Sequence, residues 1–138
     1  MKKGRSFKLV KDAFNKSPYY RLLGIEVTDI KEGESRIRIA FKQKLTHLNG
    51  IVAGGAIASL ADSCVTAALL SLVESSSRIT TIEFKINFFL PVIGGELTAK
   101  AKIVHKDCET AVGVIEIINE DGKLVSKGIA TCGIEIVD

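Results

Sequence analysis

The sequence predicts an α+β fold in which a strongly curved antiparallel β-sheet wraps around one long, central α-helix. Two observations carry this prediction. From Gly54 to about Leu72, apolar residues recur every three or four positions without a proline, which is the period of a helix. After "ESSSR" the pattern changes to period two and stays there, which indicates consecutive strands joined by short turns. A helix this apolar must be covered over most of its surface, and a curved sheet provides that cover.

Six strands are expected around this helix. Two precede it in "GIEVTDIKEGESRIRIAF", where clean alternation flanks a turn at Gly33. Four follow it in "ITTIEFKINFFLP", "ELTAKAKIVHK", "TAVGVIEIIN" and "KLVSKGIATCGIEIV". Pro91 ends the first of these four, and "EDG" at 120–122 is the hairpin turn between the last two.

Residues 1–18 are expected to form an N-terminal helical segment. Phe7, Val10 and Phe14 recur at helical spacing, and the pair Ser17–Pro18 stops the helix. The basic start of the chain is not followed by an apolar segment, so no secretory signal is expected. With 138 residues, the chain is expected to form a single domain.

The composition excludes several classes of function. A formal net charge of +3 without a Lys/Arg block argues against nucleic-acid binding. The longest weakly polar run carries Asp62 and several serines, so no membrane span is expected. Three cysteines without a CxxC pair favour a cytoplasmic protein whose thiols act as small core residues. His105 and Cys108 lack the further ligands that a metal site needs, and no metal or other cofactor is expected.

Asp62 is the residue that points to function. It is the one carboxylate in "NGIVAGGAIASLADSCVTAALL", and an unpaired carboxylate that loses its water is costly. The glycine pair at Gly54 and Gly55 stands where the helix begins. The free backbone N–H groups at such a helix start favour negative charge, and the absence of Cβ atoms permits close approach.

This segment resembles the signature of the PaaI-type acyl-CoA thioesterases, which have the hotdog fold. That signature runs roughly N-x-x-G-x-x-H-G-G-x-x-x-x-L-x-D, and Gly50, the glycine pair, Leu60 and Asp62 match it in spacing. The strand from Thr81 and the closing hairpin "NEDGKLVSKGIATCGI" also resemble the family. The chain departs from the signature at Ala53, where the family usually has histidine. It departs again at His47, where an amide-bearing residue is usual.

The resemblance implies thioester hydrolysis, with Gly54 as the main donor of an oxyanion hole and Gly55 in support. Asp62 would attack the carbonyl or take a proton from water, and the sequence leaves both routes open. Asp62 lies eight residues after Gly54, which is about 12 Å along a helix. An aspartate cannot bridge that gap to one carbon. If both residues act on one thioester, they therefore come from two subunits of a homodimer; a homotetramer is implied by resemblance alone.

Two further site residues are expected, each with an alternative. In the resembled family, a Ser or Thr at the position of Thr81 helps to hold water or the carboxylate, although a β-branched residue also suits a strand. His47 is a candidate to orient the thioester in place of the missing family residues, or else it is an exposed loop histidine. Asn49 beside it is expected in a turn.

The expected function is hydrolysis of acyl-CoA to free acid and CoA, with acyl-CoA as the small-molecule partner. The alternative is a non-catalytic acyl-CoA or acyl-chain binding protein of the same fold. It is favoured by Ala53, which stands where the family usually has histidine. A dehydratase of this fold is a third interpretation, which the lack of a histidine at the start of the helix disfavours.

The acyl pocket is expected to be lined by small and apolar side chains: Ala53, Ala58, Leu60 and Phe88. Candidates to bind the CoA phosphates are Arg78, Lys123 and Lys127.

Overall fold

The structure is a computed structural model, and it describes residues 4–137 of the chain. Within those residues the elements are α1 (Phe7–Lys16), α2 (Pro18–Leu23), β1 (Glu26–Lys31), β2 (Glu34–Ala40), the 3₁₀ turn η1 (Gln43–Leu45), α3 (Gly54–Leu70), β3 (Ser77–Phe88), β4 (Glu96–Lys106), β5 (Thr110–Ile118) and β6 (Leu124–Ile136).

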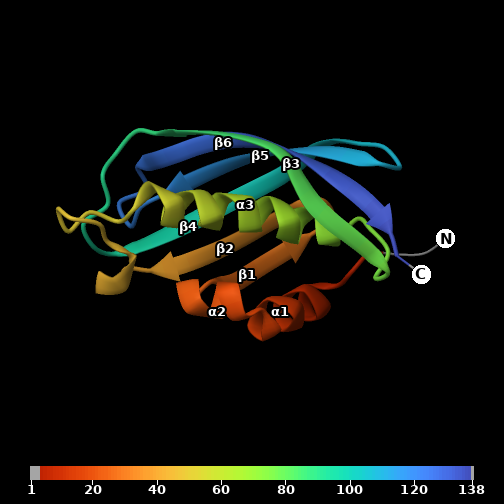
Figure 1. Cartoon of the computed structure of the whole chain (residues 1–138), viewed down its shortest axis with the longest axis horizontal. Helices are drawn as coiled ribbons and strands as arrows, with labels where there is room; N and C mark the ends of the chain where they lie inside the picture. The colour runs from red at the N-terminus through yellow and green to blue at the C-terminus, as the bar shows by residue number, and fades with distance from the viewer. Residues whose placement is uncertain (1–3, 138) are drawn as a thin grey trace.

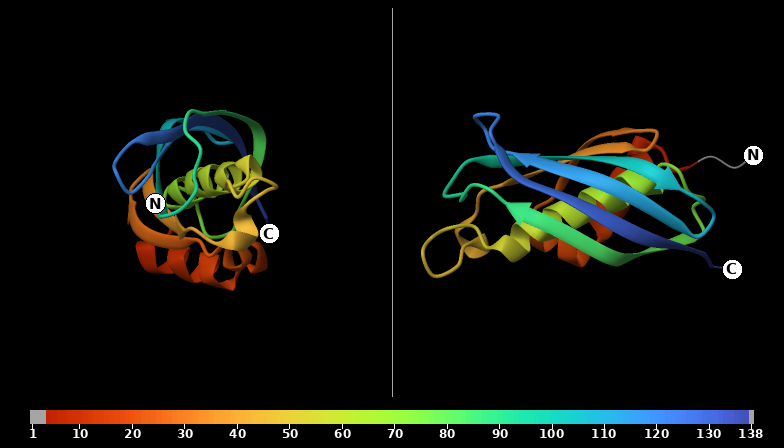
Figure 2. Two further views of the ribbon diagram at one scale, coloured as in Figure 1. Left: turned by 90° about the vertical axis from the view of Figure 1, so that its left-hand side faces the viewer. Right: turned by 90° about the horizontal axis from the view of Figure 1, so that it is seen from above.

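The six strands form one sheet in the order β1-β2-β4-β5-β6-β3, and every neighbouring pair is antiparallel. The sheet curves around α3, while α1 and α2 lie outside it against the β1 end (Figure 1, Figure 2). The predicted α+β architecture, with a curved antiparallel sheet around a central helix, is confirmed. Strands β1 and β3 are the two edges of the sheet, so each pairs on one side only.

Most of the surface of α3 is buried because the sheet wraps around it. Its buried residues are Ile57, Leu60, Ala61, Ser63, Cys64, Val65, Ala67, Ala68, Leu69 and Leu70. One side remains partly or fully exposed, and we call it the open stripe. It consists of Gly54, Gly55, Ala58, Ser59, Asp62 and Thr66. At about 100° per residue these positions project within about 140° of one another. The stripe carries one charged side chain, that of Asp62.

The N-terminal segment differs from the prediction at Pro18. The first helix, α1, ends at Lys16, so the expected stop at Ser17–Pro18 is confirmed. A further helix was not expected from the sequence, yet Pro18 is also the first residue of α2. The fixed φ of proline suits the first position of a helix, where the missing N–H is not needed. Ser17 caps α2 by accepting a hydrogen bond from the backbone N–H of Tyr20. The Tyr20 ring stacks on Phe14 of α1 at 4.3 Å between centroids, which fixes α2 against α1.

Strand β3 contains a β-bulge that changes which side chains face the helix. Thr81 pairs with Cys132 of β6, but Glu83 pairs with Thr131, so Ile82 is an extra residue between the two pairs. Without it, strict alternation would turn Glu83 toward α3. The bulge lets the strand present the hydroxyl of Thr81 first and apolar side chains afterwards.

The cysteines divide into two classes. Cys64 and Cys132 are fully buried, as the sequence predicts, whereas Cys108 is exposed in the β4–β5 turn, so its assignment to the core is wrong. Burial raises the pKa of the Cys64 thiol to about 12. Burial, together with the charge of Asp62, also raises the pKa of the Cys132 thiol.

This division predicts that one of the three thiols reacts readily with Ellman's reagent in the native protein. The buried thiols lack both solvent access and thiolate, which is the reactive form. A titration at pH 8 should therefore count one thiol before unfolding in guanidinium chloride and three after it. Cys108→Ser should abolish the native reaction. Rapid native reaction of the Cys108→Ser variant would show that Cys64 or Cys132 is accessible.

Candidate active site

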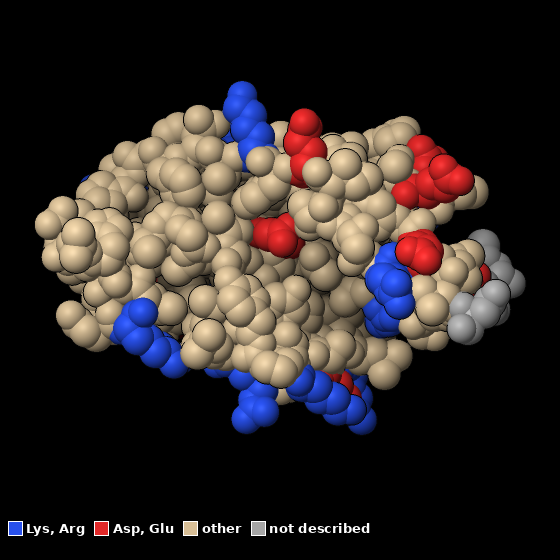
Figure 3. Space-filling view, viewed as in Figure 1, with Lys and Arg blue, Asp and Glu red and all other residues tan. Residues whose placement is uncertain are grey.

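The open stripe of α3 faces the solvent between β3 on one side and α2 on the other (Figure 1). Figure 3 shows this side of the molecule as a broad uncharged surface with one acidic side chain in a hollow near its middle. Around the stripe, large apolar side chains are exposed, among them Ile82 at 62%, Phe88 at 49% and Tyr19 at 51%. A single carboxylate on such a surface is unusual, because exposed surfaces normally carry many charges.

The start of α3 presents backbone donors that the chain leaves open. Within residues 4–137, the N–H groups of Gly54 and Gly55 donate no hydrogen bond, whereas those of the next two residues bond to the Ala53 carbonyl. Ala53 is the N-cap residue, and its methyl group cannot accept a hydrogen bond. A Ser or Asp here would accept from the first turn. Alanine therefore keeps these donors available for an external oxygen.

Asp62 is held by a residue from a distant part of the chain. The Thr81 hydroxyl donates a hydrogen bond to Asp62 Oδ1 at 2.7 Å. Thr81 faces the helix because it pairs directly with Cys132, whose side chain is buried on that face of the sheet. The structure thus brings together two of the residues that the sequence singled out. It places the glycine pair two turns earlier on the same open stripe.

Two tyrosines that the sequence analysis did not single out also reach this stripe. The hydroxyl of Tyr19 lies within hydrogen-bond distance of Ser59 Oγ, at 2.5 Å. Ser59 gives its own proton to the Gly55 carbonyl, so Tyr19 is the donor. For Tyr20, burial raises the pKa of the hydroxyl, and the charge of Asp62 raises it further. The sequence did contain a feature that could have singled them out, because they are the only tyrosines in the chain and they are adjacent.

An apolar groove of about 250 Å³ lies beside Gly54. It is lined by Ile51, Val52, Gly54, Ile57, Phe88, Phe89, Leu90, Pro91 and Val92. The Phe88 ring stands directly over Gly54, where a Cβ would lie 3.4 Å from it. Phe88 thus lies where a pocket-lining residue was expected. Leu60 does not, because its side chain is fully buried against the sheet, so that part of the prediction is wrong.

His47 lies in the exposed turn before α3. Its backbone N–H donates to the Ile51 carbonyl, and its Nδ1 accepts a hydrogen bond from the N–H of Asn49 at 3.4 Å. Asn49 is in a turn, as expected. Within the described residues, the imidazole makes no hydrogen bond to the residues of the open stripe. The structure therefore does not join His47 to the pair of Asp62 and Thr81.

The candidate phosphate-binding residues are scattered. Arg78 is at the start of β3, and Lys123 lies in the turn between β5 and β6. Lys127 projects from the outer side of β6 and forms an ion pair with Glu116 at 3.4 Å. The structure therefore does not gather these three residues into one phosphate-binding site.

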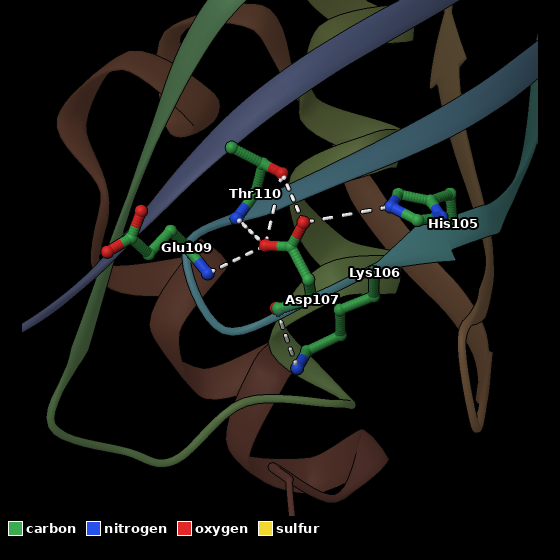
Figure 4. Close-up of polar contacts among 5 residues, drawn as sticks. All are labelled: His105, Lys106, Asp107, Glu109 and Thr110. Atoms are coloured by element: carbon green, nitrogen blue, oxygen red, sulfur yellow. Dashed lines mark hydrogen bonds and ion pairs between the residues drawn. The ribbon is translucent and has the colours of Figure 1, made fainter.

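The other cluster of polar side chains lies at the β4–β5 turn (Figure 4). Asp107 accepts hydrogen bonds from the backbone N–H groups of Glu109 and Thr110, at 2.9 and 2.8 Å. These bonds, led by that from Glu109, lower the pKa of Asp107. His105 stands 3.7 Å away from the same carboxylate. This arrangement is typical of an aspartate that stabilises a turn. Residues 4–137 contain no cluster of three or more His, Cys, Asp or Glu suited to a metal.

Comparison with known proteins agrees with this fold. The chain matches the Thioesterase superfamily over residues 49–126, which include α3 and β3. The acyl-coenzyme A thioesterase PaaI of Escherichia coli is 30% identical over 109 residues, which cover 77% of this chain and 74% of PaaI. A conserved Pseudomonas aeruginosa protein, PA5202, superimposes with a TM-score of 0.84 at 28% identity, over 89% of this chain and 98% of that one. A thioesterase family protein of Silicibacter pomeroyi shares the fold, with a TM-score of 0.89 at 24% identity, over 96% of this chain and all of that one.

The chain therefore belongs to the thioesterase superfamily. More closely, it is a hotdog-fold thioester hydrolase of the PaaI-like type. Membership in this class favours the enzyme over the non-catalytic binding protein. None of the helices in the described residues is both long and apolar enough to cross a membrane.

Proposed function

We propose that this protein hydrolyses acyl-CoA thioesters to free acid and CoA at a site that includes Asp62 and the start of α3. One observation carries the proposal: a carboxylate held by Thr81 at 2.7 Å is the sole charge on an open stripe that begins with the two free N–H groups of Gly54 and Gly55. Thioester hydrolysis needs a donor for the developing oxyanion and a base or nucleophile. The two N–H groups can act as the donor, and the carboxylate of Asp62 can act as the base or nucleophile.

In the proposed reaction, the thioester carbonyl oxygen accepts a hydrogen bond from the N–H of Gly54, with that of Gly55 in support. By one route Asp62 removes a proton from water, the resulting hydroxide adds to the carbonyl carbon, and the carbon–sulfur bond breaks to release CoA. By the other route Asp62 adds to the carbonyl carbon, the carbon–sulfur bond breaks to release CoA, and water then hydrolyses the mixed anhydride to give the free acid and restore the carboxylate. In both, the negative charge that develops on oxygen is stabilised by donors that are already oriented.

The site requires two subunits. Gly54 and Asp62 are about 12 Å apart along the rigid axis of α3, so one thioester cannot meet both in the same chain. In a symmetric homodimer with the two α3 helices side by side, the start of one helix can face Asp62 of the other. The free edge of β3 and the exposed side chains of Ile82 and Phe88 suit such an interface. Two dimers could form a tetramer by other surfaces.

The acyl group is assigned to the apolar groove beside Gly54. Its lining contains no charged side chain, and its volume suits a small to medium hydrocarbon or aromatic acyl group. His47 is proposed to orient the sulfur or the carbonyl of the bound thioester from the turn before α3.

The test is release of free thiol from a panel of short, medium, long and aromatic acyl-CoAs. The proposal expects hydrolysis that is fastest for apolar acyl groups that fit the groove. The result that overturns it is the absence of hydrolysis for every member of the panel, with acyl-CoA binding intact by calorimetry. That result would identify a protein that binds acyl-CoA without acting on it.

Thr81→Val should lower kcat about tenfold, because the carboxylate loses the hydroxyl that fixes its orientation. Valine keeps the shape and the β-branch, so the strand and its bulge should persist. Thr81→Ser retains the hydroxyl and should keep most of the activity. The measurement is steady-state kinetics on the best substrate of the panel. Equal kcat values for the Val and Ser variants would show that the hydrogen bond to Asp62 is not used.

A further inference from the structure

We propose that the phosphates of CoA bind at a basic corner formed by Arg21 of α2 with Lys42 and Lys44 of the η1 segment. This inference rests on the proposed function, since it assumes a CoA thioester at Gly54. It gives a binding site to the phosphate-bearing part of CoA, which the apolar groove cannot hold.

The corner is basic because acidic residues are missing from the two segments that build it. Residues 13–25 and residues 41–61 contain no Asp or Glu, although the chain has 16 of them. The three residues of the corner, together with Lys16, lie in these segments. In Figure 3, several basic side chains line the lower edge of the open face, where Figure 1 places α1 and α2, and acidic side chains gather toward the upper right. A polyanion is thus attracted to the α2 side of the stripe.

Specific contacts bring these two segments together beside the start of α3. The amino group of Lys42 lies against Gly24, which caps the C-terminal end of α2. The carbonyl of Leu45 accepts a hydrogen bond at 2.8 Å from the N–H of Ala53, the N-cap of α3. The turn η1 therefore connects the end of α2 to the position immediately before the proposed oxyanion donors. The segment that carries Lys42 and Lys44 thus leads directly into the start of α3.

The two flanks of the open stripe suit the two halves of an acyl-CoA molecule. Ile57 borders the apolar groove, and Ser59 holds Tyr19. Two residues apart on a helix, they project about 160° away from each other, so groove and tyrosine lie on opposite flanks. The acyl group enters the groove, and the pantetheine arm leaves over the half-exposed ring of Tyr19 toward α2.

Recognition at the corner is electrostatic. CoA carries a diphosphate and a ribose phosphate, and Arg and Lys side chains bind such groups through charge-assisted hydrogen bonds. The corner should therefore act on binding of the CoA portion and leave the chemical step unchanged. It should also lose its effect with a thioester that has no phosphates.

The experiment compares two triple variants on two substrates. The first is Arg21→Gln, Lys42→Gln, Lys44→Gln. The matched control removes the same charges from the outer face of the sheet, as Arg36→Gln, Lys100→Gln, Lys102→Gln. Each is assayed at low ionic strength with an acyl-CoA and with the same acyl group on N-acetylcysteamine. We expect the KM for acyl-CoA to rise about tenfold in the first variant alone, with kcat and the N-acetylcysteamine kinetics unchanged.

An unchanged KM in the corner variant, or an equal rise in the control, would overturn the inference. Failure of the proposed function gives a different result, because wild type would then hydrolyse neither substrate. In that event calorimetry with CoA alone decides. Binding that is lost in the corner variant and kept in the control supports the site, and equal binding by both overturns it. Melting temperatures close to that of wild type show that both variants are folded.

Discussion

Asp62→Asn should lower kcat for acyl-CoA hydrolysis by on the order of a thousandfold, because the amide can neither take a proton from water nor attack the thioester. The amide oxygen of asparagine can still accept the hydrogen bond from Thr81, so the geometry of the site should be kept. KM should change little. The measurement is thiol release under steady-state conditions, with the folded state checked by circular dichroism.

The control is Asp121→Asn, which makes the same chemical change in the exposed turn before β6. It should keep the activity of wild type. Activity that survives in the Asp62→Asn variant would mean that another residue does the chemistry. His47 would then be the next residue to replace.

A mixture of Asp62→Asn and Gly54→Pro subunits should recover activity that neither variant has alone. If each site combines Gly54 of one subunit with Asp62 of the other, a mixed dimer contains one intact site. Random exchange makes half of the dimers mixed, so activity should reach about a quarter of the wild-type value. The subunits are mixed after mild dissociation and reassembly, and thiol release is followed. No recovery, with exchange verified by native mass spectrometry, would place both residues of a site in the same chain.

Proline is chosen because it removes the N–H of Gly54 with little other change. Gly54 is the first residue of α3, where proline is tolerated. The preceding Ala53 already has the extended conformation that proline requires, with φ −61° and ψ 139°. Loss of one such donor should cost about two to three orders of magnitude in kcat. Gly54→Ala keeps the N–H but adds a Cβ that would lie 3.4 Å from the Phe88 ring, where the thioester approaches, so it should lower kcat less than Gly54→Pro does.

The elements of the fold could be read from local patterns. The apolar residues from Ile57 onward repeat at helical spacing, and the four later strands alternate regularly, because each element buries one face against its neighbour. The start of α2, which the sequence analysis missed, is equally local, because a proline that follows the end of one helix can begin the next. The capping hydroxyl of Ser17 and the stacking of Tyr20 on Phe14 favour a new start.

The candidate site could be predicted only in part. Gly54, Gly55 and Asp62 are close in sequence on one helix, so their spacing alone shows that they share a face and are too far apart for one thioester. The contact between Thr81 and Asp62 spans 19 positions, and it depends on the bulge at Ile82. The alternation of apolar and polar residues in a strand does not predict where such a bulge occurs.

By itself, then, the sequence determined the wrapped helix, the glycine pair at its start and the single carboxylate along it, because these depend on period and spacing within one segment. Only the tertiary structure decided which hydroxyl holds that carboxylate and that α2 and η1 meet in a basic corner beside the start of α3. Contacts of this kind depend on strand register and on the packing of separate segments against one another. The sequence of one segment alone does not determine the free energy of that packing.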